Sequence, residues 1–481
     1  MPFSKTPIVQ TYETKRVNFI SNPQQRSSDP NKDFRLVNMM TEVLKSPVGD
    51  QSKYYIKSRP GMTYAYGTQT DVGRGIYYWV YNGTGYAMSV VGNKVYSNGT
   101  AVLTLTTSTG ECGFTEFISS TGVVSLVLLD GTKGYVFSNP STSVQITDPD
   151  FPTPHIPMPI FLDAYLLVAK AGTTDVYNSD LDDPTKWTAG SYISAEMYPD
   201  TLVGLSKNNN YVYAIGSGSV EYLYDAANAT GTPLARHESA VQQFGCAAVG
   251  SIVQTEKEVI FLGETNNGGH TVWTIDGFKE KEIGIPAIKS ALLAEGSNLP
   301  NIKAHCIRVS GQKLYIMCLT SRTLVYSFTT EMWSEWATGT GAFIGTHATD
   351  GPNGAAYILG ATDGNIYLMS EDYFTDNGTA IQCSVTSSKL DFDTINRKFM
   401  HRLALIGDVP DDTLVDSAVS IQWSDDDYKT WSAARTLTFN ADLPAIFQGG
   451  MFRRRAFKIT YSLPHLLRLE TIELDINKGN A

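Results

Sequence analysis

The sequence has few charged residues for its length. Asp, Glu, Lys and Arg make up 18% of the 481 residues, below the roughly 25% usual for soluble domains. Hydrophobic residues make up 42%, so the chain can form a sizeable core and wholesale disorder is excluded. The length suits about three domain-equivalents, or one large β-propeller or barrel that occupies most of the chain.

Cysteines are also few. The five are widely separated and none forms a CxxC pair, so neither a disulfide framework nor a zinc site is indicated, and we interpret them as small buried residues. No apolar run follows Lys5, so no secretory signal is expected. The longest strongly apolar stretch, residues 123–129, is far shorter than the about 20 residues that cross a bilayer. We expect a soluble protein without membrane insertion.

Motifs for catalysis are missing. The seven histidines show no HExxH or other metal-ligand spacing, and the sequence contains no GxSxG elbow and no P-loop. Glycine-rich runs such as residues 216–218 lie between expected strands, without a following helix. We therefore predict no catalytic residue, no metal, no cofactor and no enzymatic activity.

Positive charge is in the minority and unevenly distributed. The chain has 37 Lys and Arg against 48 Asp and Glu, a net charge of −11, which is the wrong sign for a general DNA-binding protein. Residues 1–59 carry a net +5, residues 60–374 a net −14 and residues 375–481 a net −2. This segregation predicts a basic arm that contacts an acidic neighbour, with a solvated tail as the alternative.

Short strands separated by turns dominate the sequence from about residue 73. The first four are expected at 76–81, 86–91, 94–96 and 102–105, with hairpin turns at Asn82-Gly83 and Asn98-Gly99. Similar units begin near residues 114, 156, 200, 250, 303 and 343. Their spacing of about 45 residues is typical of a β-propeller, with a stack of sandwiches as the alternative.

The expected fold is all-β and has three parts. Residues 1–33, interrupted by four prolines, form an extended basic N-terminal arm, and residues 34–374 form a β-propeller of six or seven blades. Residues 375–481 form a C-terminal β-sandwich with strands such as 418–423 and 456–461. Residues 286–295 are the one predicted helix, which ends at Gly296.

A string of acidic residues resembles the Asp-box of sialidases. Residues 424–431 read SDDDYKTW, with Tyr428 where the box usually has Gly. The string is single and lies outside the repeats, so we interpret it as a hairpin brace rather than as part of a glycosidase. Consecutive carboxylates point apart, and we expect Asp425 to Asp427 to form a solvated turn.

The densest basic cluster is Arg453-Arg454-Arg455. At most two of these side chains share a face of a strand, which is too few to hold DNA firmly. We interpret the cluster as a salt link within a sheet or between subunits. The candidate subunit or partner contacts of the chain are Lys15, Arg16, Arg26, Arg453 and Arg455.

Several segments resemble the tail hub, or packaged-DNA stabilisation, proteins of short-tailed bacteriophages, which are called nozzle proteins when they form a longer tube. Residues 35–40, 58–63 and 73–77 correspond to the family's R-x-x-N, x-P-G and x-R-G patterns. Further matching segments are residues 216–222, 245–248, 261–263, 272–273, 311–315, 323–326, 333–336, 454–461 and 467–476. Gln312 stands where the family often has His, and residues before 34 have no clear counterpart.

The resemblance implies a virion tail protein, made in the host bacterial cytoplasm, that forms a ring, expected to be a hexamer, below the portal and adaptor. Such a ring retains packaged DNA, conducts it at ejection and anchors fibres, spikes or a needle. Its partners would be further copies of itself, the portal-adaptor protein, these tail appendages and the genome in transit. A mostly acidic lumen would repel DNA and let it slide. The alternatives are a sialidase-like propeller glycosidase and a non-catalytic glycan- or receptor-binding propeller.

Overall fold

The chain folds into two compact units. In this computed structural model the described residues are 12–17, 33–44, 53–228, 230–265, 269–408, 417–439 and 444–479. The propeller unit comprises Pro60–Glu331 and Thr340–Gly378. The sandwich unit comprises Met1–Arg59, Met332–Gly339 and Thr379–Ala481.

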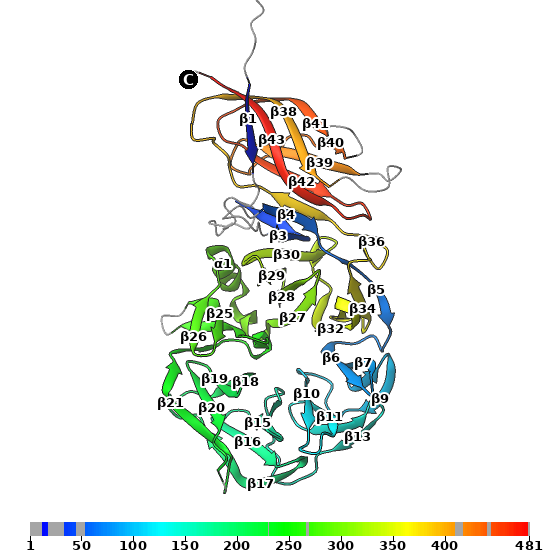
Figure 1. Cartoon of the computed structure of the whole chain (residues 1–481), viewed down its shortest axis with the longest axis vertical. Coiled ribbons are helices and arrows are strands. Elements are labelled where there is room, and N and C mark those ends of the chain that lie inside the picture. Colours follow the sequence, from blue (N-terminus) through cyan, green and yellow to red (C-terminus); the bar gives the residue numbers. More distant parts are fainter. Residues whose placement is uncertain are drawn as a thin grey trace, which may run out of the picture. The chain divides into compact units, whose positions relative to one another are not determined.

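The propeller unit contains seven sheets within its described residues, and Figure 1 shows them following one another round a circle in chain order. The first is β6 (Gly73–Tyr81), β7 (Thr84–Val91), β8 (Lys94–Ser97) and β9 (Thr100–Thr104). The second is β10 (Gly113–Ile118), β11 (Val124–Leu129), β12 (Gly134–Asn139) and β13 (Thr142–Gln145). The third is β14 (Ile160–Leu162), β15 (Tyr165–Ala169), β16 (Asp175–Asp180) and β17 (Asp183–Ser194). The fourth is β18 (Leu202–Asn208), β19 (Tyr211–Gly216), β20 (Val220–Asp225) and β21 (Leu234–Gln242).

The remaining three sheets complete the circle. The fifth is β22 (Phe244–Cys246), β23 (Val253–Gln254), β24 (Val259–Thr265), β25 (His270–Asp276) and β26 (Lys279–Glu282). The sixth has β27 (Lys303–Val309), β28 (Gln312–Cys318) and β29 (Thr323–Ser327). The seventh is β32 (Gly345–Asp350), β33 (Ala356–Gly360), β34 (Ile366–Ser370) and β5 (Gly61–Tyr66). β5 comes from the start of the unit and pairs antiparallel with β34, so the seventh sheet joins the two ends of the propeller.

The core of the propeller lies between neighbouring sheets. Apolar clusters join the first sheet to the second, the second to the third, the third to the fourth and the fourth to the fifth. A further cluster packs Tyr96 of the first sheet against Leu359 of the seventh. Because each sheet has a neighbour on both sides, strands such as β11 and β19 are nearly continuous apolar runs.

Local signals account for the turns and the helix. Asn82, Gly83, Asn98 and Gly99 all have positive φ, as the predicted tight hairpin turns require. The helix α1 (Pro286–Glu295) has the predicted bounds. Short elements of the propeller unit are η1 (Val249–Ser251), η2 (Gly296–Asn301), η3 (Pro352–Gly354), β31 (Gly341–Ala342) and β35 (Thr375–Asp376), of which β35 runs parallel to β5.

The described residues of the sandwich unit form two sheets. The first contains β1 (Glu13–Val17), β3 (Met39–Leu44), β4 (Lys53–Ser58), β43 (Arg468–Lys478), β38 (Lys398–Gly407) and β41 (Ala445–Phe452). The second contains β30 (Met332–Thr338), β2 (Arg35–Val37), β37 (Cys383–Thr386), β42 (Ala456–Tyr461), β39 (Ala418–Ser424) and β40 (Arg435–Thr438). Both sheets contribute to one apolar core. The unit also includes β36 (Thr379–Ala380).

The all-β propeller is confirmed, but the boundaries between the two units lie at other residues than the sequence predicts. Residues 33–59, placed in the arm and propeller from the sequence, supply β2, β3 and β4 to the sandwich, and the propeller begins at Pro60. β30 also belongs to the sandwich unit because it pairs parallel with β2, Val37 opposite Glu335. Residues 13–17 of the expected arm form β1, which pairs with β43. Local patterns identify strands but not partners hundreds of residues away, which explains the difference.

We predict that Gly61 is required for closure of the seventh sheet. A Cβ atom at this position would lie 2.4 Å from the Thr375 carbonyl oxygen and 2.6 Å from its nitrogen, so β5 and β35 would have to separate. Gly61→Ala should lower the free energy of unfolding by about 1–3 kcal/mol. Gly190→Ala is the control, because a Cβ there meets nothing within 4 Å, and it should change stability by less than about 0.5 kcal/mol. Equal urea midpoints for the two variants would contradict this role.

Candidate functional site

Residues of the family-like segments meet in the sandwich unit. The Arg35 guanidinium donates from Nε to Glu335 Oε1 at 3.1 Å and from Nη2 to Oε2 at 2.7 Å. Asn38 Oδ1 accepts hydrogen bonds from Arg59 Nε at 2.9 Å and from the Ala337 backbone nitrogen at 2.8 Å. The R-x-x-N segment therefore fastens β2 to β30 and to the residue that follows β4.

Arg59 completes this network from the x-P-G segment. Its buried guanidinium also donates from Nη2 to the Ala337 carbonyl at 3.1 Å and lies 5.7 Å from the centre of the Trp336 ring. Trp336 is itself buried. These matching residues are thus interior supports of the fold, rather than an exposed binding site.

The x-R-G segment has a comparable role in the propeller unit. Buried Arg74 donates to the carbonyl oxygens of Gly92, Thr107, Thr109 and Gly110 at 2.7–3.0 Å, and to the Thr107 hydroxyl at 3.0 Å. These bonds fix the loop that leads from the first sheet to the second. A Cβ on the adjacent Gly75 would lie 2.4 Å from the Cys112 carbonyl oxygen, so the segment needs glycine there.

The predicted contact residues of the arm lie partly within the described structure. On β1, Lys15 Nζ is 2.5 Å from Glu13 Oε1, and Arg16 Nε is 3.3 Å from Glu473 Oε2. The Arg16 side chain remains largely exposed. Arg26 lies outside the described residues. Contact of these three residues with another subunit or partner stays a prediction.

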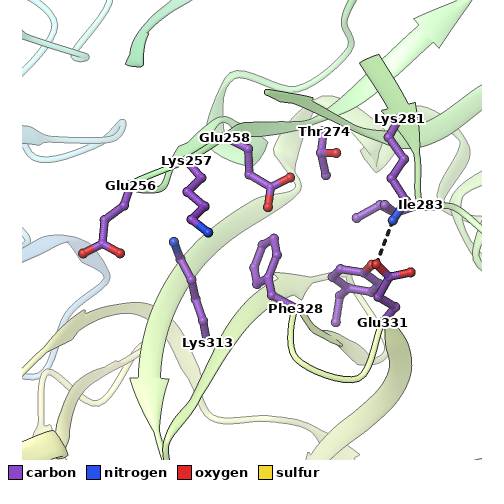
Figure 2. Close-up of a pocket in the computed structure, with 10 residues that line it drawn as sticks. Glu256, Lys257, Glu258, Thr274, Lys281, Ile283, Lys313, Phe328 and Glu331 are labelled. Carbon is purple, nitrogen blue, oxygen red and sulfur yellow. Dashed lines mark hydrogen bonds and ion pairs between the residues drawn. The ribbon is translucent and has the colours of Figure 1, made fainter. Parts of the chain in front are cut away.

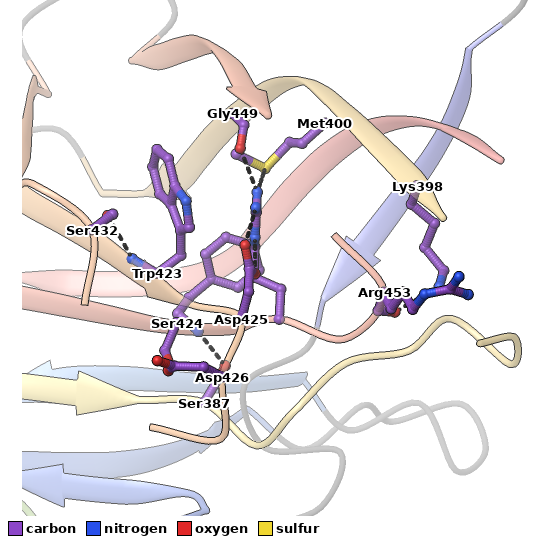
Figure 3. Close-up of polar contacts among 12 residues, drawn as sticks. Ser387, Lys398, Met400, Trp423, Ser424, Asp425, Asp426, Ser432, Gly449 and Arg453 are labelled. Carbon is purple, nitrogen blue, oxygen red and sulfur yellow. Dashed lines mark hydrogen bonds and ion pairs between the residues drawn. The ribbon is translucent and has the colours of Figure 1, made fainter. Parts of the chain in front are cut away.

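The two predicted contacts of the C-terminal cluster differ in accessibility. Arg455 is 1% exposed and donates from Nε and Nη2 to the two Asp425 carboxylate oxygens, each at 2.7 Å. It also donates from Nη1 to the Gly449 carbonyl at 2.7 Å. The prediction of a partner contact at Arg455 is therefore wrong, since the salt link is internal. Arg453 is exposed and donates to the Ile395 carbonyl at 2.8 Å, and Figure 3 shows it beside Lys398.

The Asp-box-like string forms a braced hairpin, as predicted. Asp426 accepts hydrogen bonds from the Thr430 backbone nitrogen at 2.9 Å, the Thr430 hydroxyl at 2.5 Å and the Ser424 hydroxyl at 2.9 Å. The bonds from Thr430 lower the pKa of Asp426 to about 2. Tyr428 has φ of 66°, which explains why Gly is usual there, and its buried hydroxyl donates to the Ser387 carbonyl at 3.0 Å. Asp425 and Asp426 are exposed, as expected for a solvated turn, and Asp425 also accepts the ion pair of Arg455.

A polar cluster that the sequence did not reveal links three sheets of the propeller. Glu111, which precedes β10, places Oε1 at 2.7 Å from Lys303 Nζ on β27 and Oε2 at 2.6 Å from His347 Nε2 on β32. Burial opposes ionisation of Glu111, but the His347 hydrogen bond and the charges of His347 and Lys303 outweigh it and lower its pKa to about 2. Nearby, burial and the charge of His347 lower the pKa of His305 to about 3. Glu111, Lys303 and His347 are too far apart in the sequence for their spacing to predict this cluster.

A hollow of mixed charge lies where the fifth and sixth sheets meet, with a volume of about 320 Å³. Figure 2 shows lysine and glutamate side chains around it. They are Glu256, Lys257, Glu258, Lys281, Lys313 and Glu331. Lys281 pairs with Glu331 at 2.9 Å, and Lys313 lies 5.6 Å from the centre of the Phe328 ring. With three carboxylates balanced by three ammonium groups, the hollow favours neither an anionic nor a cationic ligand.

Two further observations concern metals and membranes. Among the described residues, no group of three or more His, Cys, Asp or Glu is arranged to hold a metal ion. No helix in that part of the chain is long and apolar enough to cross a membrane.

The fold and these interior networks define a seven-sheet β-propeller joined to a β-sandwich. A family model described as "Bacteriophage P22 Gp10, beta-propeller" matches residues 24–373. The chain therefore belongs to this family of phage tail hub, or nozzle, proteins, and is a virion tail component by family. No relative among the curated proteins matches the chain.

Solved propeller structures are similar to the chain at low identity. The Cps50 (Swd1) β-propeller domain of Myceliophteria thermophila is 8% identical, with a TM-score of 0.42, and the match covers 64% of this chain and 99% of that chain. A catalytically inactive virginiamycin B lyase from Staphylococcus aureus is 10% identical, with a TM-score of 0.43 and coverage of 69% and 99%. The N-terminal domain of Nup159 is 9% identical, with a TM-score of 0.37 and coverage of 70% and 99%. These matches add nothing to the family assignment.

The burial of Arg455 predicts unequal effects of two neighbouring substitutions. Arg455→Met would leave the Asp425 carboxylate and the Gly449 carbonyl without their donors, and should lower the free energy of unfolding by about 2–4 kcal/mol. Arg453→Met is the matched control and should cost less than about 1 kcal/mol because Arg453 is exposed. Urea unfolding of both variants checks this. An Arg455→Met variant as stable as the wild type would show that the internal salt link is dispensable.

The polar cluster predicts a pH-dependent contribution to stability. Glu111→Gln should lower the free energy of unfolding at pH 7 by about 1 kcal/mol, since one charge of the cluster is lost. The folded pKa of Glu111, about 2, lies below the ordinary value of 4.5. The contribution is thus complete above about pH 4.5 and declines as the pH falls towards about 2. Urea titrations near pH 7, 4 and 3 should show a shrinking difference from wild type, and a constant difference would refute the assignment.

Proposed function

We propose that the protein is a structural subunit of the tail tube of a short-tailed phage. Copies of the chain form a ring, expected to be a hexamer, below the portal and adaptor. The ring retains packaged DNA, conducts it at ejection and anchors fibres, spikes or a needle. The observation that carries this proposal is the family match, which covers nearly the whole propeller unit.

The distribution of charge supports passage of DNA. The propeller unit has fifteen Lys and Arg against twenty-nine Asp and Glu, a net −14, whereas the sandwich unit has a net +3. A mostly acidic wall repels phosphates and adds no electrostatic barrier to release, whereas a basic wall would hold the genome through many contacts. A map of the ring with a bore lined by lysine and arginine would refute this part of the proposal.

The arm is proposed to contact the adaptor or an adjacent subunit. Support comes from Lys15 and Arg16 on β1, which pairs with β43 and leaves the Arg16 side chain 66% exposed and able to reach a neighbour. The propeller glycosidase has less support, because the Asp-box-like hairpin braces the sandwich unit. A glycan-cleavage assay on host surface polysaccharide distinguishes the two functions.

Ring formation is tested on the purified full-length chain. One copy has a mass of 52.6 kDa, so a hexamer would measure about 316 kDa by native mass spectrometry, and electron microscopy should show sixfold rings. Phage that lack the protein should fill their heads and then lose DNA, measured as a fall in nuclease-protected genome. Complete tails and full DNA retention without the protein would overturn the proposed function.

A further inference from the structure

An apolar strip lies on the outer face of the first sandwich sheet. Phe399 of β38 and Met451 of β41 are directly opposite each other, and Phe447 of β41 is opposite Arg402. The three apolar residues are 45%, 47% and 61% exposed. Because opposite residues of an antiparallel pair share a face, these side chains project together to the outside of the sheet.

Side chains alternate between the inner and the outer face along both strands, and the three apolar residues occupy outward-facing positions. The neighbouring pairs Lys398–Phe452 and Leu403–Ile446 are buried on the inner face. Ile395, 72% exposed, extends the strip, since its carbonyl is bound by Arg453, two residues after Met451. The outer face of an antiparallel sheet is usually polar, and clustered exposed apolar side chains mark a protein interaction surface.

The rim of the strip is positively charged. Arg397, Arg435, Arg453 and Arg454 are exposed, and none of the four has an ion pair with a carboxylate of the described residues. Arg397 and Arg453 each lie two residues from the Phe399–Met451 pair, and Arg435 Nη1 donates to the Phe447 carbonyl at 2.6 Å. Asp391 and Asp393 are exposed in the loop before Ile395. Among the described residues of the rim, four arginines against two carboxylates leave a net positive charge.

The edge of β41 is unsuited to adding another strand. Gln448 and Gly450 have positive φ, 58° and 78°, so the strand is kinked there. Arg435 already occupies the Phe447 carbonyl and lies 3.4 Å from the Gln448 carbonyl. Kinks and edge arginines oppose strand pairing, so a partner would contact the face of the sheet.

We infer that the strip is the surface through which the sandwich unit of one copy binds the acidic propeller unit of a second copy. Charge complementarity selects this occupant, because the sandwich unit carries a net +3 with these four arginines around the strip, and the propeller unit carries a net −14. A contact between two different surfaces of the same chain generates a ring when its rotation closes. The inference rests on the proposed ring and names its interface.

The first test is a pair of substitutions at equally exposed positions of the sandwich unit. Met451 lies in the strip and Leu466 lies outside it, and both are 47% exposed. Met451→Ser should weaken self-association about tenfold. Phe399→Ser combined with Phe447→Ser and Met451→Ser should give monomers at micromolar concentration, with an unchanged urea midpoint because the side chains are exposed. Leu466→Ser should assemble as the wild type does.

A second test addresses the charge. Arg453→Glu combined with Arg454→Glu should shift assembly, measured by sedimentation, to lower salt concentration, because attraction to the acidic partner is lost. Unchanged assembly of the triple serine variant, or a wild type that stays monomeric, overturns the inference. Normal rings that fail to retain another tail protein would also overturn it, since that protein would then be the occupant. Nuclease protection of the genome tests the proposed function separately.

Discussion

Closure of the propeller depends on one pairing between its two ends. β5, the first strand of the propeller unit, lies beside β34, nearly the last, and its Gly61 lies too close to Thr375 for any side chain. Each sheet buries its faces against its neighbours, so no sheet is stable without the next one. An apolar cluster that includes Leu359 of the seventh sheet and Tyr96 of the first joins the two ends of the circle.

Buried arginines have a large part in a chain that has few charges. Arg59, Arg74 and Arg455 are among the largest fully buried side chains, and each donates to several carbonyl or carboxylate oxygens. Such bonds fasten loops where no sheet hydrogen bonds are available. Asp130 and Glu221 are buried in the propeller unit as well as Arg74, so burial does not make the propeller surface more acidic than its composition.

Prediction from the sequence succeeded where the signal is local. Asn-Gly turns, the helix with Pro286 at its start, the strand at 456–461 and the hairpin braced by Asp426 depend on neighbouring residues. It failed where strands pair across hundreds of residues, as β2 and β30 do. The cluster of Glu111 and His347 was missed for the same reason. Arg455 was wrongly predicted as a partner contact, because the sequence does not show whether a given arginine is buried.

The order of synthesis constrains when this protein can fold. β5 emerges from the ribosome about three hundred residues before β34, its partner strand. Val17 of β1 is likewise synthesised long before Ile472, the residue it pairs with in β43. Contacts so distant in sequence form slowly, and their apolar faces stay exposed until they do. A product terminated before β34 lacks both a closed propeller and a finished sandwich, whereas one terminated between β34 and β43 lacks only the finished sandwich. Only a chain that has been translated through its final strand can therefore complete both units before assembly.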